Sequence, residues 1–159
     1  MPKLGFRSLA STNSLLLPSA MKIFENQNFK TYTSKDVVGV ELGGSLKNVI
    51  AIGAGILDGI KSSESTKAAF ITRGLKEIRT LSKILGAKNT TFMGLSGIGD
   101  LMLTAYGEQS RNRSLGIYIG KGKRIKLILS STKTVAEGFY TSKAIYELTR
   151  KYKIHSPII

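Results

Sequence analysis

Lys47 is the side chain whose type and surroundings best suit chemistry. It is a lone lysine inside an apolar, glycine-rich stretch, and Asn48 follows it directly. Burial of an ammonium group is costly unless the charge is paired, and it lowers the pKa of an amine toward neutrality. An amine in such a place can donate or accept a proton near neutral pH. Two simpler interpretations stay open: an ion pair with Glu41 or Asp58, or a side chain that extends into solvent.

Acidic and basic groups that could do chemistry occur at three further places. Asp100 follows glycines in SGIGDLML, which predicts a tight turn into a helix with the carboxylate in its first turn. Residues 110–113 read Ser-Arg-Asn-Arg, and their guanidinium, hydroxyl and amide groups suit a phosphate. Glu137 stands in an apolar stretch and could accept hydrogen bonds from a ligand. The simpler interpretations are first-turn helix carboxylates for both acids and a solvated basic face for 110–113.

A long helix must position Lys47. Ser34 is a good helix N-cap residue and Asp36 suits a first turn, so we predict a helix that runs through Ile60 and is buried on nearly all sides. Its glycines stand at positions 39, 43, 44, 53, 55 and 59, and each costs up to about 1 kcal/mol relative to alanine. Because glycine lets another backbone or a ligand come close, we expect close approaches along this helix.

Four shorter helices are predicted after the long helix, over 65–87, within 89–107, within 109–122 and over 134–154. Gly86 is the stop signal of the first of these, and Ser96 is the expected cap of the second. The apolar face of the last helix would be formed by Tyr140, Ala144, Ile145, Leu148 and Tyr152.

Residues 1–33 have a different character. They predict a strand end at 8–12, a helix at 18–26 and a strand at 29–34. A strand, a helix and a strand without further strands indicate the edge of an α/β domain. We therefore expect a mainly α fold, in which an all-helical domain at 34–159 follows this remnant.

Composition narrows the class of protein. The chain has 159 residues, 42% of them apolar, which suits one folded domain with at most a small appendage. The chain has no cysteine, which excludes zinc sites made of thiolates, and its only histidine is His155. We therefore expect no metal site. No apolar run approaches the roughly 20 residues of a membrane span. Since the N-terminal apolar block is too weak for a secretory signal, we expect a cytoplasmic protein.

The net charge of +14 attracts anions such as nucleic acid, acidic membranes or phosphorylated small molecules. Residues 121–126 are the densest basic run, and one interpretation is a nucleic-acid patch over 111–133 that uses Lys121, Lys123 and Arg124. The run has no interleaved aromatic residues, and no helix-turn-helix or RNA-binding signature frames it. A solvated loop is therefore the favoured interpretation.

Five sequence blocks occur in an order that resembles one enzyme family. They are GVELGGSLKNVIAIGAGILDGI, AAFITRG, TFMGLSGIGDLMLT, QSRNRSLG and VAEGFYTSKA, followed by a terminal SPI. With these blocks the chain resembles the NAD(P)-dependent glycerol-3-phosphate dehydrogenases of the bacterial type. The resemblance implies a helical C-terminal substrate domain like that of 6-phosphogluconate dehydrogenase. It also implies interconversion of dihydroxyacetone phosphate and sn-glycerol 3-phosphate, which feeds glycerophospholipid synthesis.

The resemblance further implies roles for individual residues. The catalytic residue, which exchanges a proton at the substrate oxygen, would be Lys47. The other substrate contacts would come from Asp100, Ser110, Arg111 and Asn112. Contacts to the cofactor, NAD or NADP, would come from Arg111, Val135 and Glu137.

Relative to the complete family pattern, the nucleotide-binding half with its glycine-rich loop and second active-site lysine is missing, as is the helix after SPI. The resemblance therefore implies a substrate domain truncated at its C-terminal end, with most of the cofactor site in the missing half. We expect the chain alone to be inactive. One expected partner is a separate N-terminal half. In the complete enzyme we also expect further copies in a homo-oligomer. The alternative is an inactive fragment that acts, if at all, as a basic nucleic-acid-binding module.

Overall fold

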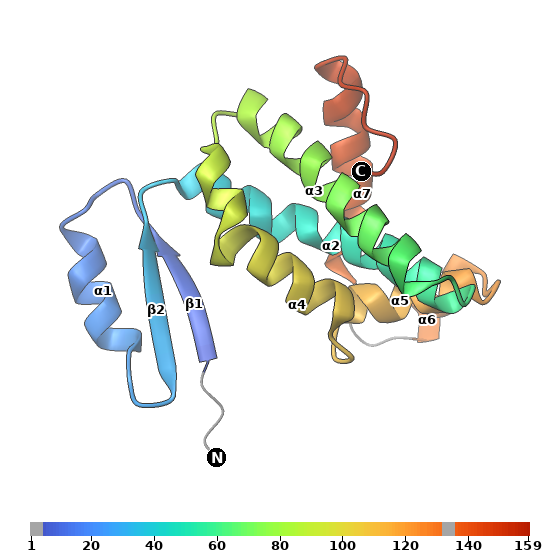
Figure 1. Cartoon of the computed structure of the whole chain (residues 1–159), viewed down its shortest axis with the longest axis horizontal. Helices are drawn as coiled ribbons and strands as arrows, with labels where there is room; N and C mark the ends of the chain where they lie inside the picture. The colour runs from blue at the N-terminus through green and yellow to red at the C-terminus, as the bar shows by residue number, and fades with distance from the viewer. Residues whose placement is uncertain (1–4, 132–135) are drawn as a thin grey trace.

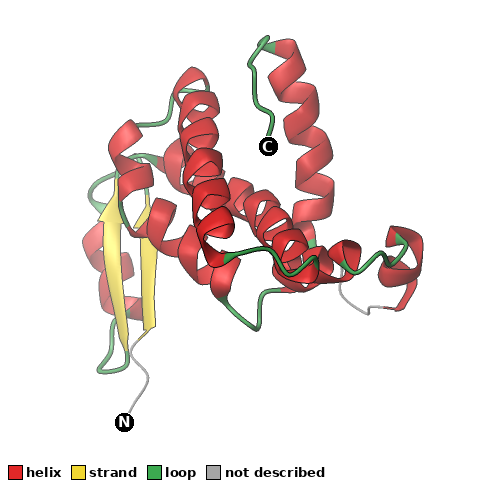
Figure 2. Ribbon diagram, turned by 45° about the vertical axis from the view of Figure 1, so that its right-hand side comes forward, coloured by secondary structure: helices red, strands yellow, loops and turns green. Residues whose placement is uncertain are grey.

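The computed structural model describes residues 5–131 and 136–159 and is mainly α-helical, as the sequence predicts (Figures 1 and 2). A small β-α-β unit precedes a cluster of helices built on the long helix α2 (Val37–Gly59). The helices that pack against α2 are α3 (Glu64–Ile84), α4 (Asp100–Tyr106), α5 (Arg111–Gly120) and α7 (Glu137–Lys151). The remaining helical elements are η1 (Asn89–Met93), η2 (Leu95–Gly99) and α6 (Ile125–Ser131).

The β-α-β unit is a parallel pair of strands joined by one helix. β1 (Gly5–Ala10) pairs with β2 (Phe29–Ser34) along its whole length, and α1 (Leu16–Phe24) connects them. Glu25 accepts hydrogen bonds from the backbone N–H and the hydroxyl of Thr31, at 3.1 and 2.9 Å, which fastens the end of α1 to β2. The predicted strand at 29–34 is confirmed, whereas the first strand begins at residue 5 rather than 8.

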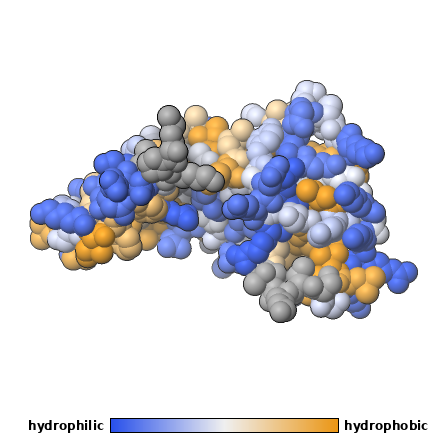
Figure 3. Space-filling model, turned by 90° about the horizontal axis from the view of Figure 1, so that it is seen from below, coloured by the Kyte–Doolittle hydropathy of each residue, from blue (hydrophilic) through white to orange (hydrophobic). Residues whose placement is uncertain are grey.

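Apolar side chains of this unit face solvent. The exposed ones are Phe6, Leu15, Leu16, Ile23, Phe24 and Tyr32. Figure 3 shows the unit as the lobe at the left, with apolar surface among its polar groups. Within the described residues the sheet has only these two strands, so each strand has one edge without a β partner. Both properties are typical of a piece of a larger parallel sheet.

Asp36 begins the central helix and ties it to the turn after α3. Its carboxylate accepts hydrogen bonds from the backbone N–H of Gly39 and Lys88, at 3.0 and 2.9 Å, and from the Thr91 hydroxyl at 2.5 Å. The predicted cap at Ser34 is wrong, because Asp36 is the N-cap and the Ser34 hydroxyl accepts from the Asp36 N–H instead. Burial raises the pKa of Asp36, but these hydrogen bonds outweigh burial and hold the pKa below its ordinary value.

Glycines let α2 and α5 cross with their backbones in contact. A Cβ added at Gly55 would collide with the carbonyl oxygen of Arg113, and one at Gly116 would collide with the carbonyl oxygen of Ile52. The same contact recurs one turn further along both helices. The expected close approach of another backbone is therefore confirmed, and the packing it permits offsets the helix propensity that the glycines lose.

The main core lies between α2, α3 and the helices that follow. Its fully buried large side chains include Leu46, Ile50, Leu81, Phe92 and Leu101. α3 ends as predicted, because Gly86 has a positive φ of 90° that an L side chain rarely adopts. α2 is less completely buried than predicted, since Val38 and other residues of its first half are exposed.

The expectation that no apolar run approaches the length of a membrane span is wrong for α2. Among the described residues it is the one helix that is long and apolar enough to cross a membrane by length and composition. In this structure it packs against four other helices, a position that a core helix takes.

One further local prediction is wrong, and another is only partly correct. Ser96 does not cap a helix, because it lies inside η2 and its hydroxyl donates to Ser8 Oγ at 2.6 Å. The basic run at 121–126 is not entirely loop, since α6 already begins at Ile125. The run is exposed throughout.

The predicted apolar face of α7 is only partly correct. Ile145 is buried, but Tyr140 and Tyr152 are exposed. The helix turns Gly138 inward, where an added Cβ would lie 2.7 Å from the carbonyl oxygen of Asn48. Because Tyr140 is two positions further along, it leaves the helix on the opposite side.

Candidate functional site

A cleft lies between the β-α-β unit and the helices. Its volume is about 540 Å³, a size typical of small-molecule sites, and β1, β2, α2, η2 and α4 line it. Ser8 and Ser96, which are hydrogen-bonded to each other, link β1 to η2 in its wall. Polar groups in the wall include Arg7 and Asp100, so an anion or a hydroxyl-bearing ligand would find partners there.

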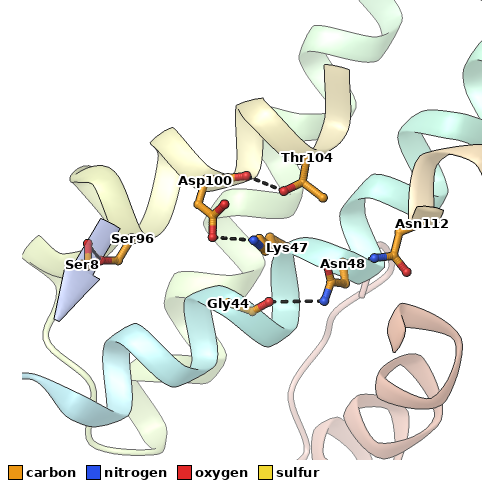
Figure 4. A network of polar contacts seen from close by, with 8 residues as sticks. All are labelled: Ser8, Gly44, Lys47, Asn48, Ser96, Asp100, Thr104 and Asn112. Carbon is orange, nitrogen blue, oxygen red and sulfur yellow. Dashed lines mark hydrogen bonds and ion pairs between the residues drawn. The ribbon is translucent and has the colours of Figure 1, made fainter. Parts of the chain in front are cut away.

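Lys47 and Asp100 form an ion pair at this cleft (Figure 4). Lys47 Nζ lies 2.5 Å from Asp100 Oδ2, and the two side chains are 18% and 26% exposed. Asp100 is the first residue of α4, which confirms the predicted first-turn carboxylate. Glu41 and Asp58, the partners that the sequence suggests for Lys47, are not used; Asp100 comes from 53 residues further along the chain. Both side chains of the pair therefore keep part of their surface accessible.

Asn48 and Asn112 join three helices beside Lys47. The Asn112 side chain donates to Asn48 Oδ1 at 2.9 Å and accepts from the Gly138 N–H at 2.9 Å. The Asn48 side chain also donates to the Gly44 carbonyl at 3.3 Å, and both amides are buried. Asn112, predicted to contact substrate, is thus already bound to α2 and α7, although one N–H of its amide group has no partner among the described residues.

In the predicted phosphate-binding turn at 110–113, one side chain caps the helix and another is exposed. The Ser110 hydroxyl caps α5 by accepting from the Arg113 N–H at 3.2 Å. Arg111 is exposed, and it makes no hydrogen bond or ion pair with the residues that the structure describes. It lines a small hollow of about 140 Å³ between α5 and α6. Arg111 is therefore the cation of this turn that is free to bind a ligand.

Arg113 belongs to a second, more buried charge cluster. Its Nε donates to Asp58 Oδ2 at 2.6 Å, while Lys67 Nζ donates to both oxygens of Asp58 at 2.8 and 2.9 Å. Burial raises the pKa of the Asp58 carboxyl, but the hydrogen bonds and charges of Lys67 and Arg113 outweigh burial and hold the pKa below its ordinary value. Both cations of this cluster are therefore paired with Asp58, Lys67 through Nζ and Arg113 through Nε.

The cofactor contacts implied by the resemblance are only partly described. Glu137 is the first residue of α7 and is exposed. Val135 lies outside the described residues. Over the ranges 5–131 and 136–159, the structure contains no group of three or more acidic, histidine or cysteine side chains that could hold a metal ion.

Thr104 is a site residue that sequence reasoning did not single out. Its hydroxyl donates to the Asp100 carbonyl at 2.6 Å, one helical turn from the ion pair (Figure 4). A threonine four residues after a candidate acid is the only signal in the sequence, and threonine often bonds in this way in ordinary helices.

Comparison with known proteins gives a consistent result. Residues 36–159 match the family model of the NAD-dependent glycerol-3-phosphate dehydrogenase C-terminus. The chain is 50% identical over 150 residues to glycerol-3-phosphate dehydrogenase [NAD(P)+] of Thermoanaerobacter sp. (strain X514), which covers 94% of this chain and 46% of that protein. It is 46% identical over 138 residues to the enzyme of the same name from Francisella tularensis subsp. novicida, with 87% of this chain and 42% of that protein covered.

A solved structure agrees with these relatives. The crystal structure of glycerol-3-phosphate dehydrogenase from Coxiella burnetii superposes with a TM-score of 0.93 at 40% identity, over 98% of this chain and 48% of that one. The chain thus spans about half the length of the proteins that it matches.

Proposed function

The chain belongs to the family of NAD-dependent glycerol-3-phosphate dehydrogenases, as its C-terminal part, and from this premise we propose that it supplies the substrate half of an enzyme that interconverts dihydroxyacetone phosphate and sn-glycerol 3-phosphate. The observation that carries the proposal is the Lys47–Asp100 ion pair at the cleft. The nucleic-acid alternative has no support in the fold or in the relatives.

Lys47 is suited to move the proton of this reaction. When the ketone is reduced, its carbon gains a hydride and its oxygen becomes an alkoxide. The Lys47 ammonium would stabilise that charge and give the oxygen its proton, which leaves a secondary alcohol and a neutral amine. Since the Lys47 side chain is 18% exposed, solvent can return a proton to the amine. Asp100 would hold Nζ in position through the cycle, and oxidation of the alcohol would run the same steps in reverse.

The phosphate of the substrate needs cationic and neutral donors. Arg111 fits because its guanidinium is exposed and free among the described residues, and the cap residue Ser110 precedes it. The second amide N–H of Asn112 is the third donor of this turn. We propose that these groups hold the phosphate while Lys47 meets the oxygen that changes oxidation state.

The side chains present fit one edge of a dinucleotide site. Arg111 can pair with a cofactor phosphate, and the exposed Glu137 carboxylate can accept from hydroxyl or amide groups. The sequence contains no glycine-rich phosphate loop after a strand, so the rest of that site must come from elsewhere. When bound, NAD or NADP supplies or takes up the hydride. This chain's own residues bind the substrate, orient it and move its proton.

We therefore propose two parts for the chain: residues 1–33 as the edge of a nucleotide-binding domain and residues 34–159 as the helical substrate domain. The exposed apolar side chains and free edges of the β-α-β unit suit a separate N-terminal half as partner. A cytoplasmic location, a homo-oligomer in the complete enzyme and a role in glycerophospholipid synthesis remain predictions.

Turnover measurements test the proposal. With dihydroxyacetone phosphate, the purified chain alone should oxidise neither NADH nor NADPH above background, because half of the site is absent. Addition of the nucleotide-binding half of a relative should produce turnover. Lys47→Ala should then lower kcat at least about 100-fold, as expected for a lost proton donor.

Lys76→Ala is the matched control, since Lys76 is an exposed lysine on α3 that does not line the cleft. Its activity should equal that of the unsubstituted chain. Turnover by the chain alone, or near-normal activity of Lys47→Ala, would contradict the proposal.

A further inference from the structure

The Asp58 cluster joins four helices behind the first turn of α5. Asp58 on α2 accepts from Lys67 on α3 and from Arg113 on α5. Lys67 is 3% exposed, and its Nζ also lies 4.3 Å from the ring centroid of Tyr106 on α4. One carboxylate therefore binds two cations that come from different helices. The loss of either cation leaves Asp58 with the other.

This cluster separates the two arginines of the α5 turn. Two positions along an α-helix correspond to a rotation of about 200°, so the side chains of Arg111 and Arg113 leave on opposite sides. Asp58 draws Arg113 inward, and Arg111 is left exposed. The Arg113 carbonyl meanwhile contacts Gly55, so side chain and backbone of this residue both pack on α2.

We propose that Asp58 is a positioning residue for substrate binding: by holding Arg113, it sets the rotation of the turn that presents Ser110 and Arg111 to the substrate phosphate. Arg113, whose type also suits a phosphate, supports the turn and does not bind the ligand. This inference rests on the proposed function, because it requires the turn to bind a phosphate-bearing substrate.

Asp58→Asn distinguishes positioning from direct binding. The change releases Arg113 but keeps its positive charge. If Arg113 bound phosphate itself, its release would leave phosphate affinity unchanged or make it stronger. If Asp58 positions the turn, affinity falls, because Ser110 and Arg111 lose their fixed orientation.

Arg113→Gln and Lys67→Met form a matched pair within the cluster. Arg113→Gln leaves both hydrogen bonds from Lys67 to Asp58, so the chain should fold while α5 loses its anchor. Lys67→Met removes a cation of the same cluster but keeps the Asp58–Arg113 pair and thus the anchor. Both lower stability, and only the first should change ligand affinity. Arg113→Lys keeps a cation near Asp58 and should restore part of the affinity.

Two readouts apply to these variants. The first is titration of the full chain alone with sn-glycerol 3-phosphate, followed by NMR, in which Arg113→Gln and Asp58→Asn should bind about 10-fold more weakly. The second is kinetics of the chain combined with the nucleotide-binding half of a relative. There the same variants should raise KM for dihydroxyacetone phosphate about 10-fold, with a smaller change in kcat.

Unchanged or tighter binding by Asp58→Asn overturns the inference, as does an equal loss of affinity in Lys67→Met and Arg113→Gln. If circular dichroism shows that Asp58→Asn does not fold, the matched pair decides. If the combined enzyme turns over and the variants have normal KM values, the positioning role of Asp58 is overturned and the proposed function stands. Absence of turnover in the combined enzyme counts against the proposed function, and the NMR titration still decides whether Asp58 positions the turn.

Discussion

Lys47 and Arg111 differ in how the fold treats their charges. Lys47 is paired with Asp100 in a partly shielded position, whereas Arg111 is exposed and free among the described residues. A reaction that develops negative charge on one oxygen and carries a permanent charge on a phosphate needs both kinds of cation. The first must be oriented to transfer a proton, and the second must be available to bind.

Asp36 gives a prediction about pH. Because its folded-state pKa lies below the ordinary value of 3.8, the Asp36 carboxylate stabilises the fold above that pH, and the contribution is lost as pH falls through the folded pKa. Asp36→Asn should lower the free energy of unfolding by about 2 kcal/mol at pH 7. The difference between the two proteins should shrink below about pH 4.

Urea unfolding at pH 7 and at pH 3 measures this difference. Glu108→Gln is the control, since Glu108 is exposed, and its effect should be small at both pH values. An Asp36→Asn effect that stays constant with pH would contradict the assigned role of the carboxylate charge.

At the scale of elements, the crossing of α2 and α5 decides where the site residues meet. The glycine contacts bring the two backbones together, and this places Asn112 within reach of Asn48 and Arg113 within reach of Asp58. A wider crossing would pull both polar pairs apart. The glycines of α2 therefore serve the site through packing.

Gly55→Ala tests this packing. The added methyl group would collide with the Arg113 carbonyl, so the variant should lose about 1–3 kcal/mol of stability, as overpacked sites do. Gly44→Ala, on the same helix, is the matched control. Nothing lies within 4 Å of a Cβ added at Gly44, and alanine should gain up to about 1 kcal/mol there. Thermal unfolding of both variants gives the comparison, and equal effects would show that the α2–α5 contact is not limiting.

At the scale of the whole molecule, residues near both ends of the described chain pack onto distant elements. β1 is linked to η2 through Ser8 and Ser96. The backbone N–H groups of Ile158 and Ile159 donate to Glu77 Oε2 at 2.9 and 3.2 Å, and both isoleucines pack against the main core. Glu77 on α3 thereby fastens residues that follow α7.

Glu77→Ala should release this segment. We expect a loss of about 1–2 kcal/mol of stability, since two backbone donors lose a charged acceptor, and faster proteolysis after residue 151. Glu147→Ala, a change at an exposed acid on α7, is the control and should leave both properties unchanged. Limited proteolysis with mass spectrometry locates the cleavage, and equal cleavage rates would contradict the role of Glu77.

Local patterns in the sequence determined most of the elements. Helical spacing, glycine stops and the alternation at 29–34 predicted the long helix, the helix ending before Gly86 and the second strand. The order of the motifs indicated the family that the comparisons show. The helices and the strand depend on residues within a few positions of each other, and the motif order is a property of the sequence itself, so the sequence alone carries both.

Only the tertiary structure decided the partners of the site residues. Lys47 meets Asp100 across 53 residues, Arg113 meets Asp58 across 55, and Asn112 meets Asn48 across 64. Glu41 and Asp58 were the candidates nearer to Lys47 in the sequence, but the residue that pairs with it is Asp100 on α4. The two arginines of the α5 turn are likewise the same residue type, but Arg113 pairs with Asp58 and Arg111 is exposed. Which charge faces which depends on helix rotation and distance, which are set by backbone contacts between elements far apart in the chain.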